Sequence, residues 1–233
     1  MGMCGKFTRG VMSISIVGTP QSGSAINGGN VTLTFDGTPA QNDVVIVIGG
    51  SGTFRTPNPT APGTGYTQIA LDASTIYFGA WYKRLGASPD ASVVCNGTGN
   101  VNDATSYVSY VLRGVDTSTA LDATATTAGE TTSTNPDAPS ITTVTNGAWV
   151  IACAGSRIND ASITAPSGYS NQVSATNTDA FSLSVSAATK EVTTAGAENP
   201  ASFTTWSSAA WFAISIAIRP ATTTATGNFF LLF

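Results

Sequence analysis

Charged residues are scarce in this chain. They make up 9% of its 233 residues, against about 25% in ordinary globular proteins. Serine, threonine, asparagine and glycine supply most of the polarity instead. A surface with so few charges repels its neighbours weakly, so copies can pack closely against each other or within a larger assembly. The net charge of −4, without any dense cluster of Lys and Arg, argues against nucleic acid as a partner.

Histidine is absent, and cysteine occurs only as Cys4, Cys95 and Cys153. No two cysteines form a C-x-x-C pair. Most zinc-site patterns and any histidine-based catalytic triad are therefore excluded, and no metal or cofactor is expected. The odd number argues against a disulfide framework. Cys153 lies in an apolar stretch, where we expect it to be a small core residue.

Long apolar runs of the kind that membranes or export require are missing as well. Residues 11–17 alternate with serine, whereas a signal peptide needs a continuous apolar region at this point. The apolar residues 229–233 are far too few to span a bilayer. The sequence thus predicts neither a membrane-spanning nor an export segment.

Two apolar runs organise the sequence, at residues 107–116 and 211–220. Val, Ile, Tyr, Phe and Trp dominate both, which suits a buried strand. Each run is stopped by an arginine, Arg113 or Arg219, followed at once by glycine or proline. The runs are short and are ended by residues that favour turns, so strands are predicted rather than helices.

The chain also repeats itself. Residues 42–50 resemble residues 146–154, an offset of 146 − 42 = 104. The Thr-Ala-Pro…Gly-Tyr segments at 60–66 and 164–169 are offset by 164 − 60 = 104 at their first residue. A lysine pair and an arginine pair recur in the same order at nearly the same spacing, which makes four repeated features. The period is longer than a solenoid unit, which indicates a two-fold duplication inside one sandwich.

The remaining two features are the lysine pair Lys83 and Lys190 and the strand-ending arginines, which are 219 − 113 = 106 residues apart. No segment has sustained helical spacing, and residues 116–139 are low in large apolar side chains, so we expect them to cross the surface. Short strands are predicted at 13–17, 30–35, 44–48, 69–71, 76–83, 141–144, 148–154, 181–185, 203–206 and 211–218.

The predicted fold class is all-β: a jelly-roll-like antiparallel β-sandwich with an internal pseudo-two-fold duplication. It would span residues 13–220, with half-units at about 13–116 and 138–220. Residues 1–12 would form an arm containing Lys6 and Arg9, and residues 221–233 a linker with an apolar end. Exposed alone, that end would be an aggregation hazard, so we expect it to dock in its own protomer or in a neighbour's groove; a frayed terminus is the alternative. The docking residues would be Lys6, Arg9, Phe229, Phe230, Leu231, Leu232 and Phe233.

Four aspartates are candidates for chemistry. Asp116 and Asp122 flank a polar loop and could supply oxygen ligands to calcium, but aspartate at a turn more often accepts bonds from backbone N–H groups. We favour the turn. Asp72 and Asp90 could form a carboxylate pair for glycoside hydrolysis, or simply be solvated loop carboxylates. Nothing in the sequence brings them together, so no catalytic residue is predicted.

Two tyrosines and two arginines mark loop ends. Tyr66 and Tyr169 each follow a glycine, and their rings would either stack on sugars or pack over a sheet edge. Recurrence in both halves favours packing. Arg113 and Arg219 follow buried strands, where a guanidinium could tie loop carbonyls together. We expect these residues, with Asp116, to define the turns of the fold.

The motifs carry a family resemblance. Leu-Arg-Gly-Val-Asp-Thr-Ser at 112–118, the buried strand at 146–154, Ala-Pro-Ser-Gly-Tyr at 165–169 and the closing Ala-Ile-Arg-Pro at 217–220 resemble jelly-roll domains of tailed-bacteriophage virion structural proteins. The resemblance covers roughly residues 13–220. It implies a lectin-like sandwich of the kind found in head-decoration, fibre and tail-tip proteins, and it brings no catalytic residues or cofactor.

The resemblance leads to two expected functions. The first is a non-enzymatic virion protein, an exposed capsid decoration, cement or head-fibre protein. It would assemble in the host cytoplasm as a homo-oligomer and dock on a major capsid or tail protein through its arms. The alternative is a tail-fibre or tail-tip receptor-binding module that recognises host glycan through loops 51–65 and 155–168. A glycan-cleaving depolymerase is a weaker third option, because no acid pair supports it.

Overall fold

The computed structural model describes residues 10–52, 62–72, 76–160, 162–204 and 206–223. Within these ranges the chain forms strands joined by turns, and every strand pair is antiparallel. The described residues include no helix that is long and apolar enough to cross a bilayer. The all-β prediction is therefore confirmed.

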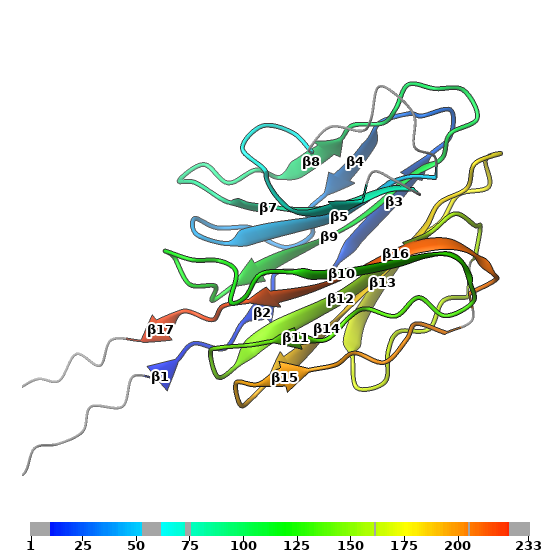
Figure 1. The fold of residues 1–233 in the computed structure, drawn as a ribbon. Helices are drawn as coiled ribbons and strands as arrows, with labels where there is room; N and C mark the ends of the chain where they lie inside the picture. Colours follow the sequence, from blue (N-terminus) through cyan, green and yellow to red (C-terminus); the bar gives the residue numbers. More distant parts are fainter. Residues whose placement is uncertain (1–9, 53–61, 73–75, 161, 205, 224–233) are drawn as a thin grey trace, which may run out of the picture.

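One large sheet is built mainly from the first half of the chain (Figure 1). Strand β9 pairs with both β2 and β3 on one side and with β5 on the other, and β7 and β6 follow. The strands of this sheet are β2 (Ser15–Ile16), β3 (Gln21–Ala25), β5 (Val44–Ser51), β6 (Thr67–Asp72), β7 (Tyr77–Arg84) and β9 (Thr105–Arg113).

A second large sheet is built from the second half, in the order β10-β16-β12-β14-β13. Its strands are β10 (Thr126–Ser133), β12 (Ala148–Ser156), β13 (Ser170–Ala175), β14 (Ser184–Val192) and β16 (Ala209–Ile218). Three two-stranded ribbons complete the fold: β4 (Val31–Thr34) with β8 (Ser92–Cys95), β11 (Ile141–Thr142) with β15 (Ala197–Glu198), and β1 (Gly10–Val11) with β17 (Thr222–Thr223).

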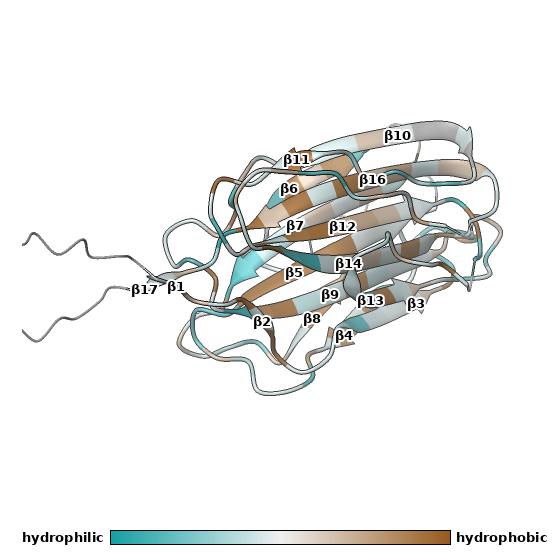
Figure 2. Cartoon of the chain, turned by 90° about the horizontal axis from the view of Figure 1, so that it is seen from below, coloured by the Kyte–Doolittle hydropathy of each residue, from teal (hydrophilic) through white to brown (hydrophobic). Residues whose placement is uncertain are grey.

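The two large sheets share one core, and the central strands are buried on both faces. Along β5, Ile46 and Ile48 point into the cluster between the sheets, while Val45 and Val47 pack on the outer face with residues of β4 and β8. This double cover explains why β5 is a continuous apolar run rather than an alternating one. Figure 2 shows the same concentration of apolar residues in β5, β9, β12 and β16.

Gly155 on β12 faces Phe78 of the other sheet at close range. A Cβ at this position would lie 2.3 Å from Cδ2 of Phe78 on β7. Phe78 is fully buried in the shared core and also contacts Phe212 edge-on, with ring centroids 6.4 Å apart. A side chain at position 155 would therefore push the sheets apart or displace the ring.

Several local predictions are wrong. Residues 116–139 were expected to cross the surface, but β10 within them joins the edge of the second sheet. Strands β3 and β13 were not predicted at all. These three strands contain mostly small or polar residues, so their apolar pattern is weak. Of the strand expected at 203–206, the described residues show an isolated bridge from Thr204 to Thr164, and the strand expected at 181–185 begins instead at Ser184.

The chain ends pair with each other. Gly10 lies opposite Thr223, and the N–H of Met12 donates to the carbonyl of Ala221 at 2.7 Å. The last residues of the expected arm and the first of the expected linker thus form a ribbon at one end of the sandwich (Figures 1 and 2). The docking residues proposed from the sequence, Lys6, Arg9 and 229–233, lie outside the described residues.

Candidate functional site

The end of the sandwich next to the β1–β17 ribbon is held by arginine–carboxylate pairs. Arg113, at the end of β9, donates from Nε and Nη2 to the two carboxylate oxygens of Asp43, at 2.9 and 2.7 Å. Its Nη2 also donates to the carbonyl of Thr38. The hydrogen bond to Asp43 raises the pKa of Arg113 above its usual value. Such a two-pronged contact fixes geometry as well as charge, and here it joins the end of β9 to the turn before β5.

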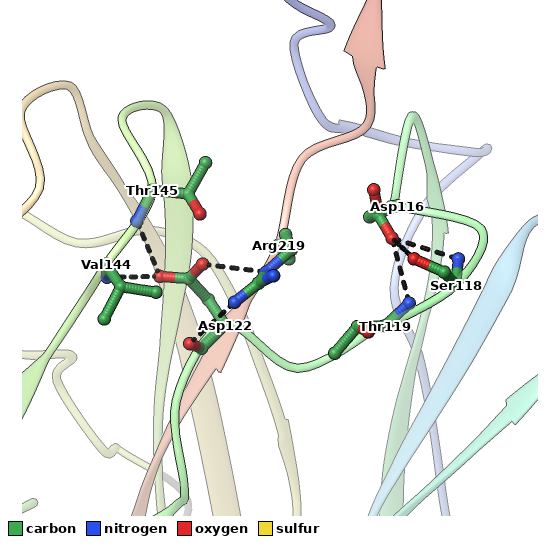
Figure 3. A network of polar contacts seen from close by, with 7 residues as sticks. All are labelled: Asp116, Ser118, Thr119, Asp122, Val144, Thr145 and Arg219. Atoms are coloured by element: carbon green, nitrogen blue, oxygen red, sulfur yellow. Dashed lines mark hydrogen bonds and ion pairs between the residues drawn. The ribbon is translucent and has the colours of Figure 1, made fainter.

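The second arginine makes the corresponding contact at the end of β16. Nε of Arg219 donates to Oδ1 of Asp122 at 3.2 Å, while Oδ2 of Asp122 accepts from the N–H groups of Val144 and Thr145 at 2.6 and 3.1 Å (Figure 3). The Asp122 side chain is 0% exposed. The carboxylate thus binds the strand end to the loop before β12.

Asp116 lies in a separate turn of the same region. Its Oδ1 accepts from the hydroxyl and N–H of Ser118, at 2.7 and 3.0 Å, and from the N–H of Thr119 at 2.9 Å (Figure 3). These bonds, the Ser118 hydroxyl first, lower the pKa of Asp116. Asp116 and Asp122 therefore serve different backbone groups, and the described residues contain no group of three or more His, Cys, Asp or Glu suited to a metal ion. Both aspartates accept hydrogen bonds from backbone N–H groups of nearby loops, as turn residues do.

The other aspartate pair is separated along strand β7. Asp72 lies opposite Phe78, whereas Asp90 pairs with Lys83, with Nζ and Oδ2 at 2.6 Å. Phe78 and Lys83 are five positions apart on β7, so their Cα atoms are about 16 Å apart at the usual rise. Glycosidase carboxylates lie only about 5–10 Å apart. This arrangement does not fit a hydrolytic acid pair.

Each half carries a tyrosine–lysine–carboxylate cluster. In the first, Nζ of Lys83 lies 5.7 Å from the centre of the Tyr66 ring and bonds Asp90. In the second, Nζ of Lys190 lies 5.8 Å from the centre of the Tyr169 ring and donates to both oxygens of Glu198. In both halves a lysine ammonium thus lies within reach of a tyrosine ring.

The two clusters differ in how the tyrosine hydroxyl is satisfied. Tyr169 donates to Oε1 of Glu198 at 3.2 Å. The Tyr66 hydroxyl is buried without a hydrogen-bond partner among the described residues. Burial raises the pKa of both phenols far above the usual value, and for Tyr169 the charge of Glu198 adds to it.

This difference gives a paired prediction. Tyr169→Phe should lower the free energy of unfolding by about 1–2 kcal/mol, because a bond to a charged acceptor is lost. Tyr66→Phe should be neutral or stabilising, because an unpaired buried hydroxyl is removed. Urea unfolding of both variants checks this. Equal losses in both would contradict the difference between the clusters.

Two pockets lie near these groups. One, of about 190 Å³, lies beside the terminal ribbon and is lined by residues including Met12, Arg113 and Ala221. The other, of about 290 Å³, lies beside the first tyrosine cluster and is lined by Gly63, Thr64, Tyr66, Lys83, Asp90, Ser92, Val93 and Val94. Of loop 51–65, residues 53–61 lie outside the described residues.

Sequence reasoning identified the tyrosines and the lysines but did not connect them. The signal was present, because an acidic residue follows each lysine at similar spacing, Asp90 after Lys83 and Glu198 after Lys190. It also missed Asp43, the partner of Arg113. Nothing in the local sequence marks that contact, which joins residues 70 positions apart.

Comparisons of the chain with known proteins give no match. No protein-family model, no curated protein and no solved structure matches the chain. The phage-domain resemblance of the sequence motifs therefore stays a prediction, and any function for the chain has to be argued from its own residues.

Proposed function

We propose that this chain is a non-enzymatic structural protein of a bacteriophage virion, most simply an exposed capsid decoration or cement protein that docks on another virion protein through its terminal segments. The observation that carries the proposal is the β1–β17 ribbon, which joins both chain ends at one end of the body.

The proposed fold is a pair of jelly-roll-like repeats produced by duplication. The order β3-β9-β5-β7-β6 is matched by β10-β16-β12-β14-β13, and β4-β8 is matched by β11-β15. In each half the first strand lies beside the last and the second beside the second-last, the nested pairing of a jelly roll. Lys83 lies opposite Val45 as Lys190 lies opposite Val150. The β6–β7 and β13–β14 ladders also carry their register shifts at matching positions.

Docking through the ends follows from chain continuity. Residues 1–9 adjoin β1 and residues 224–233 adjoin β17, so both segments are attached within one small area. Two segments attached at one point can bind the same neighbour together, which raises their joint affinity above that of either alone. The first segment carries Lys6 and Arg9 and the second ends in five apolar residues, so each offers a different kind of contact.

The test is incorporation of a shortened chain into particles. Deleting residues 224–233 should reduce occupancy at least about tenfold, since burying even one or two large apolar side chains on binding is worth that much. Replacing the same segment with a Gly/Ser peptide of equal length should cause a similar loss. This variant shows whether the side chains of the segment or only its length matter for docking. Gel quantification of purified particles measures occupancy.

The matched control is Val101→Ser, which changes an exposed apolar residue away from the ribbon. It should leave occupancy unchanged. Full occupancy by a folded chain lacking residues 224–233 would overturn the anchoring proposal.

A receptor-binding module of a tail fibre or tail tip is the second candidate. The observation that favours it is the open 290 Å³ pocket beside the end of loop 51–65. Labelled protein should then bind host cells and lose this binding when the loop is exchanged.

A further inference from the structure

The pocket beside Tyr66 combines ionic and apolar surface in one small space. Lys83 and Asp90 supply an ion pair, and Ser92 and Thr64 supply hydroxyl groups. Val94 lines the same pocket and is 45% exposed, so it offers apolar surface there. Concave sites with an apolar wall and a few fixed polar groups are typical of ligand pockets.

The carboxylate of this ion pair is more accessible than its counterpart in the second half. Asp90 is 38% exposed, whereas Glu198 is 12% exposed and accepts hydrogen bonds from both Lys190 and Tyr169. Nζ of Lys83 lies 2.6 Å from Oδ2 of Asp90. A carboxylate can accept about four hydrogen bonds, so this exposed carboxylate can also accept from a ligand. The carboxylate of the first cluster is thus open to a ligand, whereas that of the second is engaged by its own lysine and tyrosine.

An ammonium group beside a carboxylate is complementary to two neighbouring hydroxyl groups. Of two neighbouring hydroxyls, one can donate to the carboxylate and the other can accept from the ammonium, so the pair is complementary to a vicinal diol. The Tyr66 ring and Val94 offer apolar surface to the C–H face of a sugar ring. A volume of about 290 Å³ is of the size that holds a single ring.

We propose that this pocket binds one pyranose ring of a saccharide, with Lys83 and Asp90 holding a vicinal diol and Tyr66 and Val94 packing on the ring. The second half lacks this activity because Glu198 occupies the polar groups of its own cluster. The proposal goes beyond docking on a particle and gives the second candidate function a location and a ligand class.

The experiment titrates the full chain with the methyl pyranosides of mannose, galactose and glucose, followed by NMR shifts. At least one sugar should bind saturably with a dissociation constant in the millimolar range, as expected for a ligand of this size. Cyclohexylmethanol, which has a comparable ring but no vicinal diol, should not bind. Lys83→Met and Asp90→Asn should each weaken binding at least about tenfold, because a hydrogen bond to a charged group is lost.

Lys190→Met is the matched control, since it makes the same change in the second cluster. It should leave the dissociation constant unchanged, and thermal unfolding checks that each variant is folded. The proposal is overturned if no pyranoside binds, if cyclohexylmethanol binds equally well, or if Lys190→Met weakens binding as much as Lys83→Met. Particle occupancy is measured separately, so failure of sugar binding is distinguishable from failure of the docking proposal.

Discussion

Asp122→Ala is expected to lower the free energy of unfolding by about 3–5 kcal/mol. The substitution leaves the N–H groups of Val144 and Thr145 without their acceptor and removes the carboxylate that Arg219 contacts. Each buried group left unpaired costs about 1–3 kcal/mol, and the Asp122 side chain is fully shielded from water. Loss of this one carboxylate therefore loosens the end of β16 and the loop before β12 together.

Urea unfolding monitored by tryptophan fluorescence measures the loss. Asp116→Ala is the control, because Asp116 also accepts three hydrogen bonds but lies in a solvent-accessible turn (Figure 3). Water replaces those bonds readily, so its effect should be clearly smaller. Equal effects from the two substitutions would show that burial of Asp122 is not what matters.

Gly155→Ala is expected to lower the free energy of unfolding by about 1–3 kcal/mol, although it adds only a methyl group. The new Cβ would lie 2.3 Å from the Phe78 ring, which is fully buried and cannot move aside without displacing the opposite sheet. Because Gly155 and Phe78 belong to different sheets, the cost reports directly on their contact across the shared core.

A double-mutant cycle with Phe78→Leu tests this origin. The smaller side chain should relieve the overlap, so the double variant should be more stable than the sum of the single losses predicts, by about 1 kcal/mol or more. Gly196→Ala is the control, since a Cβ there meets no atom within 4 Å. Strict additivity of Gly155→Ala and Phe78→Leu would rule out the proposed clash.

Hydrophobic pattern alone was sufficient to locate the central strands. The continuous apolar residues of β5, β9, β12 and β16 leave little choice of conformation, and the lack of alternation in them suits buried strands. The edge strands β3 and β10 were missed for the opposite reason. Their sequences are mostly Ser, Thr, Ala and Gly, which carry no periodic signal, and they become strands by pairing with β9 and β16.

The candidate site, too, was predicted from the sequence only in part. Tyr66, Tyr169 and the two lysines were visible as repeated features, because repetition is a property of the sequence. Whether a tyrosine hydroxyl finds a carboxylate was not visible. Asp90 precedes β8 and Glu198 lies on β15, and this small difference in position leaves one cluster open and the other closed.

The sequence by itself determined an all-β chain, because side-chain periodicity and turn residues act locally. Only the tertiary structure decided which carboxylate each arginine meets, that β1 pairs with β17, and that the sheets touch at Gly155. Such contacts join residues far apart in the chain, as with Gly10 and Thr223, and no local pattern encodes them. They are set by the packing of the whole body, in which each pairing depends on all the others.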